Sequence, residues 1–237
     1  MGENRVVGKI VAGWKQPDRP GPAVIDGRLV RLERLDPDRH AGDLFRACSG
    51  HEWLWDYMAY GPFASASAHH RWAKDMSSGA DPVFYVLRDL ASGHCGGVAS
   101  LMRITPEAGV IEVGGICIAP EMQKGAAVSE AMFLLMQWAF VAGYRRYEWK
   151  CDALNLPSRR AAQRLGFSFE GIFRQHMLIK GRNRDTAWFS VIDTEWPGLK
   201  AAFDAWLAPA NFDARGFQRE RLSDLTGLVR GGADPAV

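Results

Sequence analysis

The sequence has few cysteines and no long apolar run, and each absence excludes a class of protein. Its four cysteines, Cys48, Cys95, Cys117 and Cys151, show no C-x-x-C spacing and so indicate neither a zinc site nor a disulfide framework. The first residues, MGENRVVGKIVAGWKQ, are too polar for a signal peptide. No apolar stretch approaches the ~20 residues of a membrane span. We therefore predict a cytoplasmic protein without membrane contact or bound metal.

The chain also lacks a charge excess and a linker. Its formal net charge of +2 over 237 residues gives no whole-chain attraction for nucleic acid. No Gly/Ser-rich or Pro-rich stretch divides it, and 47% hydrophobic residues suffice for a packed core. We expect one domain over 28–208, an arm over 1–27 that Trp14 anchors to the surface or to a neighbouring subunit, and a polar, partly disordered extension over 209–237.

The clearest order of elements lies in the middle of the chain. Residues 109–119 (GVIEVGGICIA) are rich in β-branched residues and predict a strand, in which Gly114 and Gly115 mark a weak, bulge-prone point. Over 128–142 apolar residues recur at spacings of three and four, which predicts a helix. Residues 144–152 alternate and predict a second strand. A strand, a helix and a strand in this order form a parallel, right-handed unit.

A turn of small residues joins this first strand to the helix. It contains Gln123, Lys124, Gly125, Ala126 and Ala127. The first turn of a helix has N–H groups without intrahelical partners and a partial positive charge. Because the side chains here are small, a phosphate could approach those groups, and we predict an anion site.

The flanking segments complete a mixed sheet. Further strands are expected at 28–34, 82–89, 95–104, 167–179 and 186–193, and further helices at 37–47, 67–77, 159–165 and 195–207. The strands before residue 109 lead into it as an antiparallel meander. The fold is therefore α+β, with about seven mostly antiparallel strands, a central parallel pair and flanking helices.

Two motifs connect the chain to a known family. They are EVGGICIAPEMQKGAAVSEAM, from Glu112, and CDALNLPSRRAAQRLGFSFEG, from Cys151, which contains N-x-x-S-x-x-x-A-x-x-L-G-F-x-x-E-G. In this order they resemble the GCN5-related N-acetyltransferases (GNAT), and most of all the branch of ribosomal-protein N-terminal acetyltransferases. The resemblance covers about 109–196. It implies the GNAT fold, with the two parallel strands splayed apart, and acetyl-CoA as cosubstrate.

The chain departs from the family at two places. The diphosphate loop, usually Q/R-x-x-G-x-G/A, has Ala126 and Val128 where the family has Gly and then Gly or Ala, and Gly125 stands one position early. Ala126 suits the loop if its φ stays negative. Many relatives use a Tyr as acid where this chain has Ala162. These departures leave an alternative open, a non-catalytic acyl-CoA-binding or regulatory module.

The resemblance implies roles for individual residues. Glu112 would deprotonate the amine, directly or through water, unless it is a strand glutamate that faces solvent. Ser158, at a helix start, would hydrogen-bond the leaving thiol or thiolate, unless it only caps the helix. Both residues are candidate catalytic groups. Transfer would occur by direct attack of the amine on the bound thioester, since no cysteine has the context of a nucleophile.

Other residues would bind the cosubstrate. The turn from Gln123 to Ala127 would hold the diphosphate, backbone N–H groups near Cys117 and Ile118 would polarise the thioester carbonyl, and Asn155 would contact the pantetheine arm, unless it is only a turn residue. Arg164 belongs to a basic cluster at 159–164 that would lie near the adenosine 3′-phosphate. An exposed helix face is the alternative for that cluster.

The acceptor cannot be read from the sequence, but an aromatic segment at 51–63 suggests where it binds. Trp53, Trp55 and Tyr57 either cover the edge of the core or wall an acceptor pocket. The pocket favours a small-molecule amine, and the resemblance favours a protein N-terminus. The basic tip at 180–184 could instead bind RNA, for which a broader basic face is usual. The terminal arms and the aromatic surface would suit a homodimer.

Overall fold

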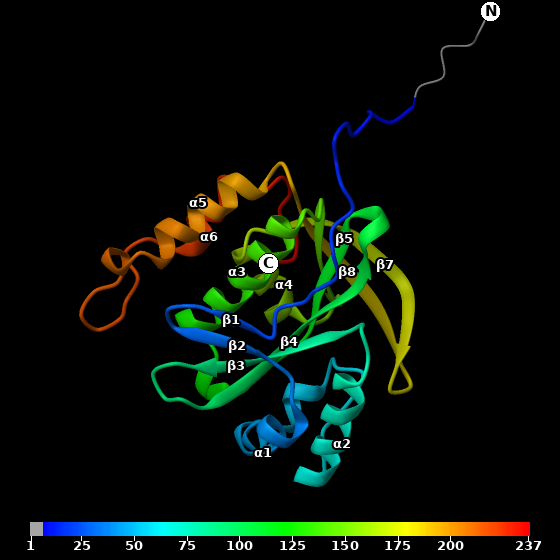
Figure 1. Cartoon of the computed structure of the whole chain (residues 1–237), viewed down its shortest axis with the longest axis vertical. Helices are drawn as coiled ribbons and strands as arrows, with labels where there is room; N and C mark the ends of the chain where they lie inside the picture. The colour runs from blue at the N-terminus through cyan, green and yellow to red at the C-terminus, as the bar shows by residue number, and fades with distance from the viewer. Residues whose placement is uncertain (1–6) are drawn as a thin grey trace, which may run out of the picture.

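Eight strands form one mixed sheet (Figure 1). The computed structural model describes residues 7–237. The strand order is β1-β2-β3-β4-β5-β6-β8-β7, and within the described residues every neighbouring pair is antiparallel except β5 and β6. This confirms the expected α+β fold. The strands are β1 Val24–Asp26, β2 Val30–Arg34, β3 Val83–Asp89, β4 Cys95–Thr105, β5 Val110–Ile118, β6 Arg146–Asp152, β7 Ser168–Ile179 and β8 Arg182–Ile192.

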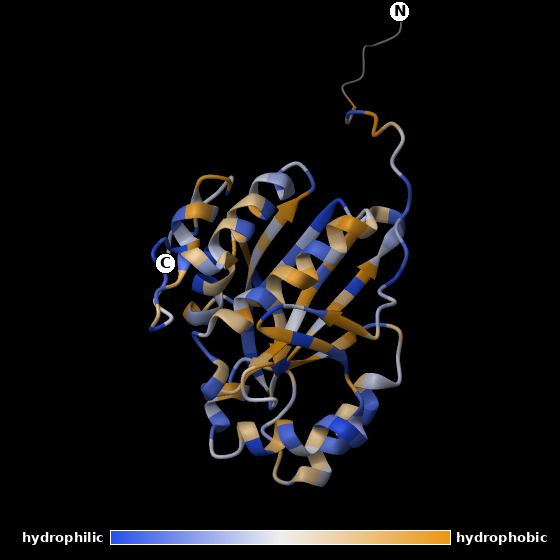
Figure 2. Cartoon of the chain, turned by 60° about the vertical axis from the view of Figure 1, so that its left-hand side comes forward, coloured by the Kyte–Doolittle hydropathy of each residue, from blue (hydrophilic) through white to orange (hydrophobic). Residues whose placement is uncertain are grey.

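Helices cover both faces of this sheet. Because successive residues of a strand point to opposite faces, Tyr85 and Leu87 pack into a core beneath α3 and α5, while Phe84 and Val86 pack into a second core beneath α1 and α2. Figure 2 shows the apolar residues concentrated on the strands and on the inward sides of the helices. The helices are α1 Pro37–Cys48, α2 Ala66–Ser77, α3 Ala126–Ala142, α4 Leu156–Arg164, α5 Trp196–Leu207 and α6 Leu222–Gly227.

The parallel strands part halfway along their length. Residues Val110–Val113 of β5 pair with Arg146–Trp149 of β6, and the pairing ends there although both strands continue. On the other side of β5, the register with β4 shifts between Val98 and Ser100. Gly115 lies there with φ +59, and an added Cβ would come within 2.9 Å of the Phe84 ring. The expected weak point and the splay are both confirmed.

The N-terminal arm is anchored to this chain. Trp14 Nε1 donates to the Gly143 carbonyl at 3.0 Å, and the Tyr144 hydroxyl donates to the Asp18 carbonyl at 3.0 Å. Residues 7–13 run away from the body of the protein (Figure 1). The predicted arm also contains β1, which is the strand that the sequence did not indicate.

The C-terminal extension is folded against the domain, which corrects the expectation of partial disorder. It contains α6, and Asp234 near its end is buried in a bidentate ion pair with Arg159 of α4, with N–O distances of 2.6 and 2.5 Å. Burial raises the pKa of Asp234, but the Arg159 guanidinium and the Ala236 N–H outweigh it and leave that pKa lowered. Arg159 is therefore not part of an exposed basic cluster.

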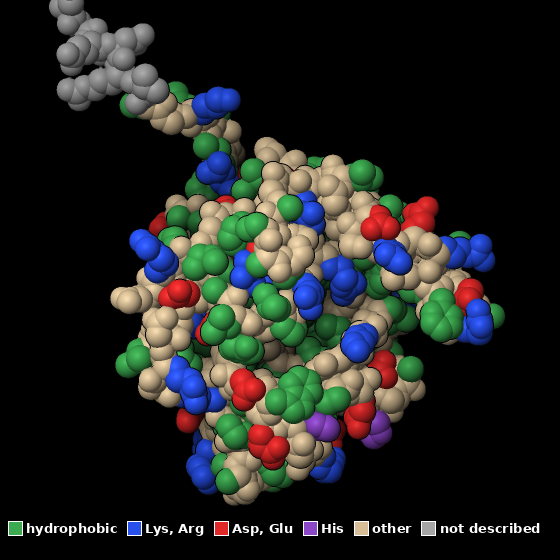
Figure 3. All heavy atoms as spheres, turned by 180° about the vertical axis from the view of Figure 1, so that it is seen from behind, with side chains coloured by type: hydrophobic (Ala, Val, Ile, Leu, Met, Phe, Trp, Pro, Cys, Tyr) green, Lys and Arg blue, Asp and Glu red, His purple; other side chains and the backbone are tan. Residues whose placement is uncertain are grey.

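The surface opposite the view of Figure 1 carries mixed charges. Figure 3 shows Lys and Arg side chains around a hollow near its middle, interspersed with apolar and acidic side chains. On this face there is no broad surface of one sign. Among the helices that the structure describes, none has the length and apolarity needed to cross a membrane.

Candidate active site

A cavity of about 190 Å³ opens where β5 and β6 part. We call it the central cavity. Strands β4, β5 and β6, the start of α4, the segment from Tyr57 to Tyr60 and the β7–β8 hairpin all line it. The Tyr60 hydroxyl donates to the Gly115 carbonyl at 3.4 Å, and Lys180 Nζ at the hairpin tip donates to the Trp55 carbonyl at 2.9 Å. These bonds hold the segment from Tyr57 to Tyr60 and the tip of the β7–β8 hairpin beside the cavity.

A buried carboxylate faces the central cavity. Glu112 is 2% exposed, so it is not the solvent-facing strand glutamate of the alternative. Arg103 Nη1 lies 2.6 Å from Glu112 Oε1, and Lys150 Nζ lies 2.9 Å from Oε2. Within the described residues Oε2 nevertheless has no hydrogen bond of good geometry. Glu112 is thus held between two cations at the wall of the cavity.

The parallel register places a second carboxylate beside Glu112. Glu148 lies beside Glu112 in the parallel register, and Lys150, two residues further, is on the same face of β6. Lys150 Nζ lies 2.6 Å from Glu148 Oε2 and 3.8 Å from the centre of the Trp188 ring. Glu148 does not line the central cavity. The two carboxylates share one lysine, but only Glu112 faces the cavity.

Ser158 and Asn155 lie at the start of α4, where they line the central cavity. Asn155 is the cap, because its Oδ1 accepts from the Ser158 N–H at 3.1 Å. The Ser158 hydroxyl instead accepts from Trp149 Nε1 at 3.0 Å. An indole N–H only donates, so the Ser158 hydroxyl still has its own hydrogen to donate, and the neighbouring Cys151 thiol is one acceptor within its reach. Capping therefore accounts for Asn155 but not for the Ser158 hydroxyl.

The N-terminus of α3 lies beside an open groove of about 500 Å³, which we call the α3 groove. Gly125, Ala126 and Ala127 line it. Gly125 is the N-cap and supplies no side-chain hydrogen bond, so the first N–H groups of α3 have no side-chain partner among the described residues. The left-handed backbone falls on Lys124, with φ 64, and not on Ala126, which begins the helix. Alanine therefore causes no strain here.

The residues expected to bind the cosubstrate surround this helix start. The Ala119 N–H donates to the Gly96 carbonyl across β4, so the alternation directs the Ile118 N–H toward the gap and the Cys117 N–H toward β4. Gln123 Nε2 donates to the Ile118 carbonyl at 2.9 Å. Arg164 Nη2 donates to Ser129 in the first turns of α3 at 2.7 Å. Of the two predicted carbonyl donors, the geometry favours Ile118.

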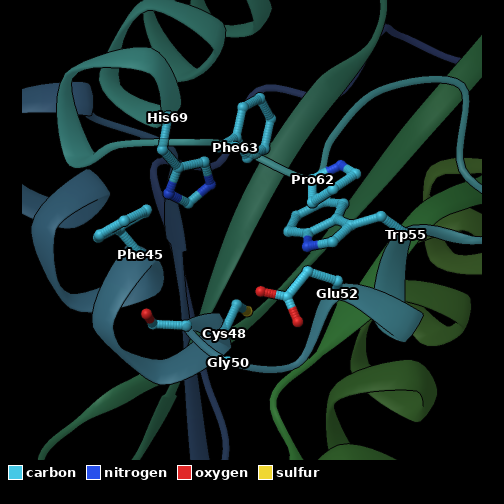
Figure 4. Close-up of a pocket in the computed structure, with 9 residues that line it drawn as sticks. Phe45, Cys48, Gly50, Glu52, Trp55, Pro62, Phe63 and His69 are labelled. Atoms are coloured by element: carbon cyan, nitrogen blue, oxygen red, sulfur yellow. The ribbon is translucent and has the colours of Figure 1, made fainter.

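The three aromatic residues predicted to bind the acceptor lie in different surroundings. Tyr57 lines the central cavity, whereas Trp53 is 53% exposed and lines no part of it. Trp55 is 4% exposed and packs against Phe63 and His69, with ring centroids 5.1 and 6.3 Å apart. It borders a separate small pocket between α1 and α2 (Figure 4). Trp55 is therefore a core residue, as the first alternative proposed.

Several lining residues were missed by the sequence interpretation. They are Tyr60, Arg103, Lys150 and Arg184. Tyr60 belongs to the aromatic segment already singled out, and the alternation of β6 could have placed Lys150 beside Glu148. Arg184 belongs to the basic tip at 180–184, which was considered for RNA and not for this cavity, and nothing local marks Arg103. The structure brings no three His, Cys, Asp or Glu side chains of residues 7–237 into a group that could hold a metal.

Comparison with known proteins agrees with this geometry. The family model described as acetyltransferase (GNAT) domain matches residues 29–168. A GCN5-related N-acetyltransferase from Brucella melitensis is 48% identical with a TM-score of 0.89, over 92% of this chain and 100% of that one. A probable GNAT-family acetyltransferase from Chromobacterium violaceum is 36% identical with a TM-score of 0.77, over 83% and 100%.

A more distant structure shares the fold alone. It is the Salmonella typhimurium acetyl transferase that modifies the N-terminal serine of ribosomal protein L7/L12, 20% identical with a TM-score of 0.60, over 70% of this chain and 96% of that one. Among curated proteins, none matches the chain.

Proposed function

The chain belongs to the GNAT family of N-acetyltransferases, and we propose that it transfers the acetyl group of acetyl-CoA to a primary amine in the central cavity, by direct attack in a ternary complex. The observation that carries this proposal is Glu112, a buried carboxylate that lines the cavity where the two parallel strands part. An amine bound there would lie within reach of a base.

The residues around α3 fit the cosubstrate. The first N–H groups of α3, at Ala126 and Ala127, would bind the diphosphate, because they have no side-chain cap and the α3 groove is open beside them. Arg164 would add a positive charge at the same helix. The Ile118 N–H and Asn155 would orient the arm that enters the gap. Acetyl-CoA supplies the acetyl group as an activated thioester.

Glu112 and Ser158 would then divide the proton transfers. Glu112 would accept a proton from the ammonium form of the acceptor, which must lose it to become a nucleophile. Ser158 would donate its hydroxyl hydrogen, which the Cys151 thiol can otherwise accept, toward the sulfur of the cosubstrate as negative charge develops there. Trp149 orients the hydroxyl for this role, because the Ser158 oxygen already accepts the indole N–H of Trp149 and can offer only its hydrogen to the sulfur.

Direct attack is supported by the state of the one thiol in the central cavity. Burial raises the pKa of Cys151 to about 11, against the opposing effect of the Ser158 hydroxyl. Since the thiolate and not the thiol is the nucleophile, Cys151 is mostly unreactive at neutral pH. An acetyl-enzyme on this cysteine is therefore disfavoured.

Steady-state kinetics with a panel of amines tests the proposal. Release of CoA from acetyl-CoA is measured while both substrates are varied. A ternary complex gives intersecting double-reciprocal lines, whereas a covalent intermediate gives parallel lines. Parallel lines would overturn direct attack, and CoA binding without turnover of any amine would overturn the proposed transfer. The panel includes small amines and short peptides with free N-termini, which separates the two acceptor classes.

A further inference from the structure

One cation of the central cavity has no counter-ion among the residues that the structure describes. Arg184 of β8 is half-buried and lines the cavity, and its Nε donates to Thr186 Oγ1 at 3.1 Å. Within residues 7–237, neither of its terminal nitrogens has a hydrogen bond, and no carboxylate lies within 4.0 Å of the guanidinium. Two N–H-bearing nitrogens of a partly desolvated guanidinium therefore lack partners.

The other charges of this region are already matched. Arg103, Glu112, Lys150, Glu148, Arg146 and Glu170 form a chain of ion pairs in which three cations alternate with three carboxylates. Asp152 also lines the cavity, but its Oδ1 accepts from the Leu154 N–H, and it makes no ion pair with Arg184 within 4.0 Å. The cavity thus has an unneutralised positive charge on its β8 side and a proton-accepting carboxylate on its β5 side.

Resting on the proposed function, we propose that the acceptor is a small amino-carboxylate, such as an amino acid, whose carboxylate binds Arg184 while its amine lies at Glu112. A guanidinium presents two parallel N–H donors to a carboxylate, and such charge-assisted pairs are the strongest hydrogen bonds available in a site. The volume of about 190 Å³, which the acetyl group must share, favours a small acceptor. Tyr57, Met58 and Met177 also line the cavity and offer contact to an apolar side chain.

This arrangement makes Arg184 a residue that determines specificity. Burial lowers the pKa of Arg184 and nearby Asp152 opposes that effect, yet an arginine remains protonated at neutral pH. An amine without a carboxylate would leave the guanidinium unpaired in a partly desolvated cavity. It should therefore be a poorer acceptor than its carboxylated counterpart, and the difference should depend on residue 184.

Matched acceptor pairs test this inference. Each pair consists of an amino acid and the same amine without its carboxylate, for example phenylalanine with phenethylamine and β-alanine with ethylamine. With the wild-type enzyme we expect kcat/KM to be about 10–100-fold higher for the carboxylated member of at least one pair, mainly through a lower KM. Arg184→Ala should remove that preference by lowering kcat/KM for the carboxylated member much more than for the decarboxylated one.

Two further variants provide controls. Arg182→Ala removes an exposed arginine of the same strand that does not line the cavity, and it should keep the preference. Arg184→Lys keeps the charge without the bidentate geometry and should restore part of it. Turnover of phenethylamine by each variant reports that the enzyme is folded.

The outcomes separate this inference from the proposed function. Equal use of both members of every pair, or an equal loss of both on Arg184→Ala, would overturn the carboxylate site and leave acetyl transfer intact. A preference for peptides amidated at their C-terminus would overturn it as well and would favour a protein N-terminus. If no amine is acetylated, the proposed transfer fails, and the inference fails with it.

Discussion

Glu112 and Glu148 provide a sharp test of catalysis, because both are buried, both contact Lys150, and only Glu112 faces the central cavity. In Glu112→Gln the side chain keeps its shape but cannot take a proton. Loss of a general base typically lowers a rate by about 10²–10⁴-fold. We expect a loss of kcat in this range for Glu112→Gln and a loss below about tenfold for Glu148→Gln.

The structural cost of the two variants should be similar. Breaking a buried ion pair costs about 3–5 kcal/mol when it leaves a charge without a partner. Here Lys150 keeps the other glutamate in each variant, and Arg103 is 46% exposed and can turn to water. We therefore expect each substitution to lower the free energy of unfolding by about 1–3 kcal/mol, a range typical of lost charged hydrogen bonds. Urea unfolding of both variants measures their free energies of unfolding and shows whether the two substitutions destabilise the protein equally.

The pH dependence identifies the lost function. Without a base, the enzyme must capture the small fraction of acceptor that is already neutral. For an amine with a pKa near ~10 that fraction grows about tenfold per pH unit between pH 7 and 9. The rate of Glu112→Gln should rise accordingly, so that its deficit is greatest at low pH. An unchanged rate and profile, or equal losses in the two variants, would refute the role of Glu112 as base.

Three other substitutions test separate parts of the structure. Gly125→Trp would fill the α3 groove and should weaken acetyl-CoA binding at least ~10-fold by calorimetry; unaltered affinity would place the diphosphate elsewhere. Ser158→Ala should lower kcat about 10–100-fold with little change in the KM for acetyl-CoA. An unchanged kcat would mean that Ser158 has a structural role, as hydrogen-bond acceptor for Trp149, and no catalytic one. Asp234→Ala leaves Arg159 buried without its partner and should cost about 3–5 kcal/mol in urea unfolding. Because the pKa of Asp234 is lowered in the folded state, its contribution should be full above about pH 4 and lost as the pH falls; a wild-type pH profile that matches that of Asp234→Ala would contradict this.

The sequence determined most of the local structure. The sequence placed α1, α2, α3 and α5 within a few residues of their observed bounds, α3 by its periodic apolar residues, and Gly114 with Gly115 marked the irregular point of β5 beyond which it no longer pairs with β6. Such features depend on residues within one helical turn or on strand alternation, which a single segment contains. The family motif and Glu112 were also readable, because both lie within one continuous stretch.

Tertiary structure alone decided which charges meet. Lys150 contacts Glu112 because β5 and β6 lie side by side in one particular register, and Arg184 enters the same cavity because β8 inserts between β6 and β7. From the sequence, Arg159 is expected on an exposed helix face. In the structure it is buried, because Asp234, 75 residues further along the chain, packs against it. No local propensity specifies such partners. They are set by which distant segments the fold brings side by side. Burial gives each such pair a large effect on stability, because an unpaired charge inside a protein is costly.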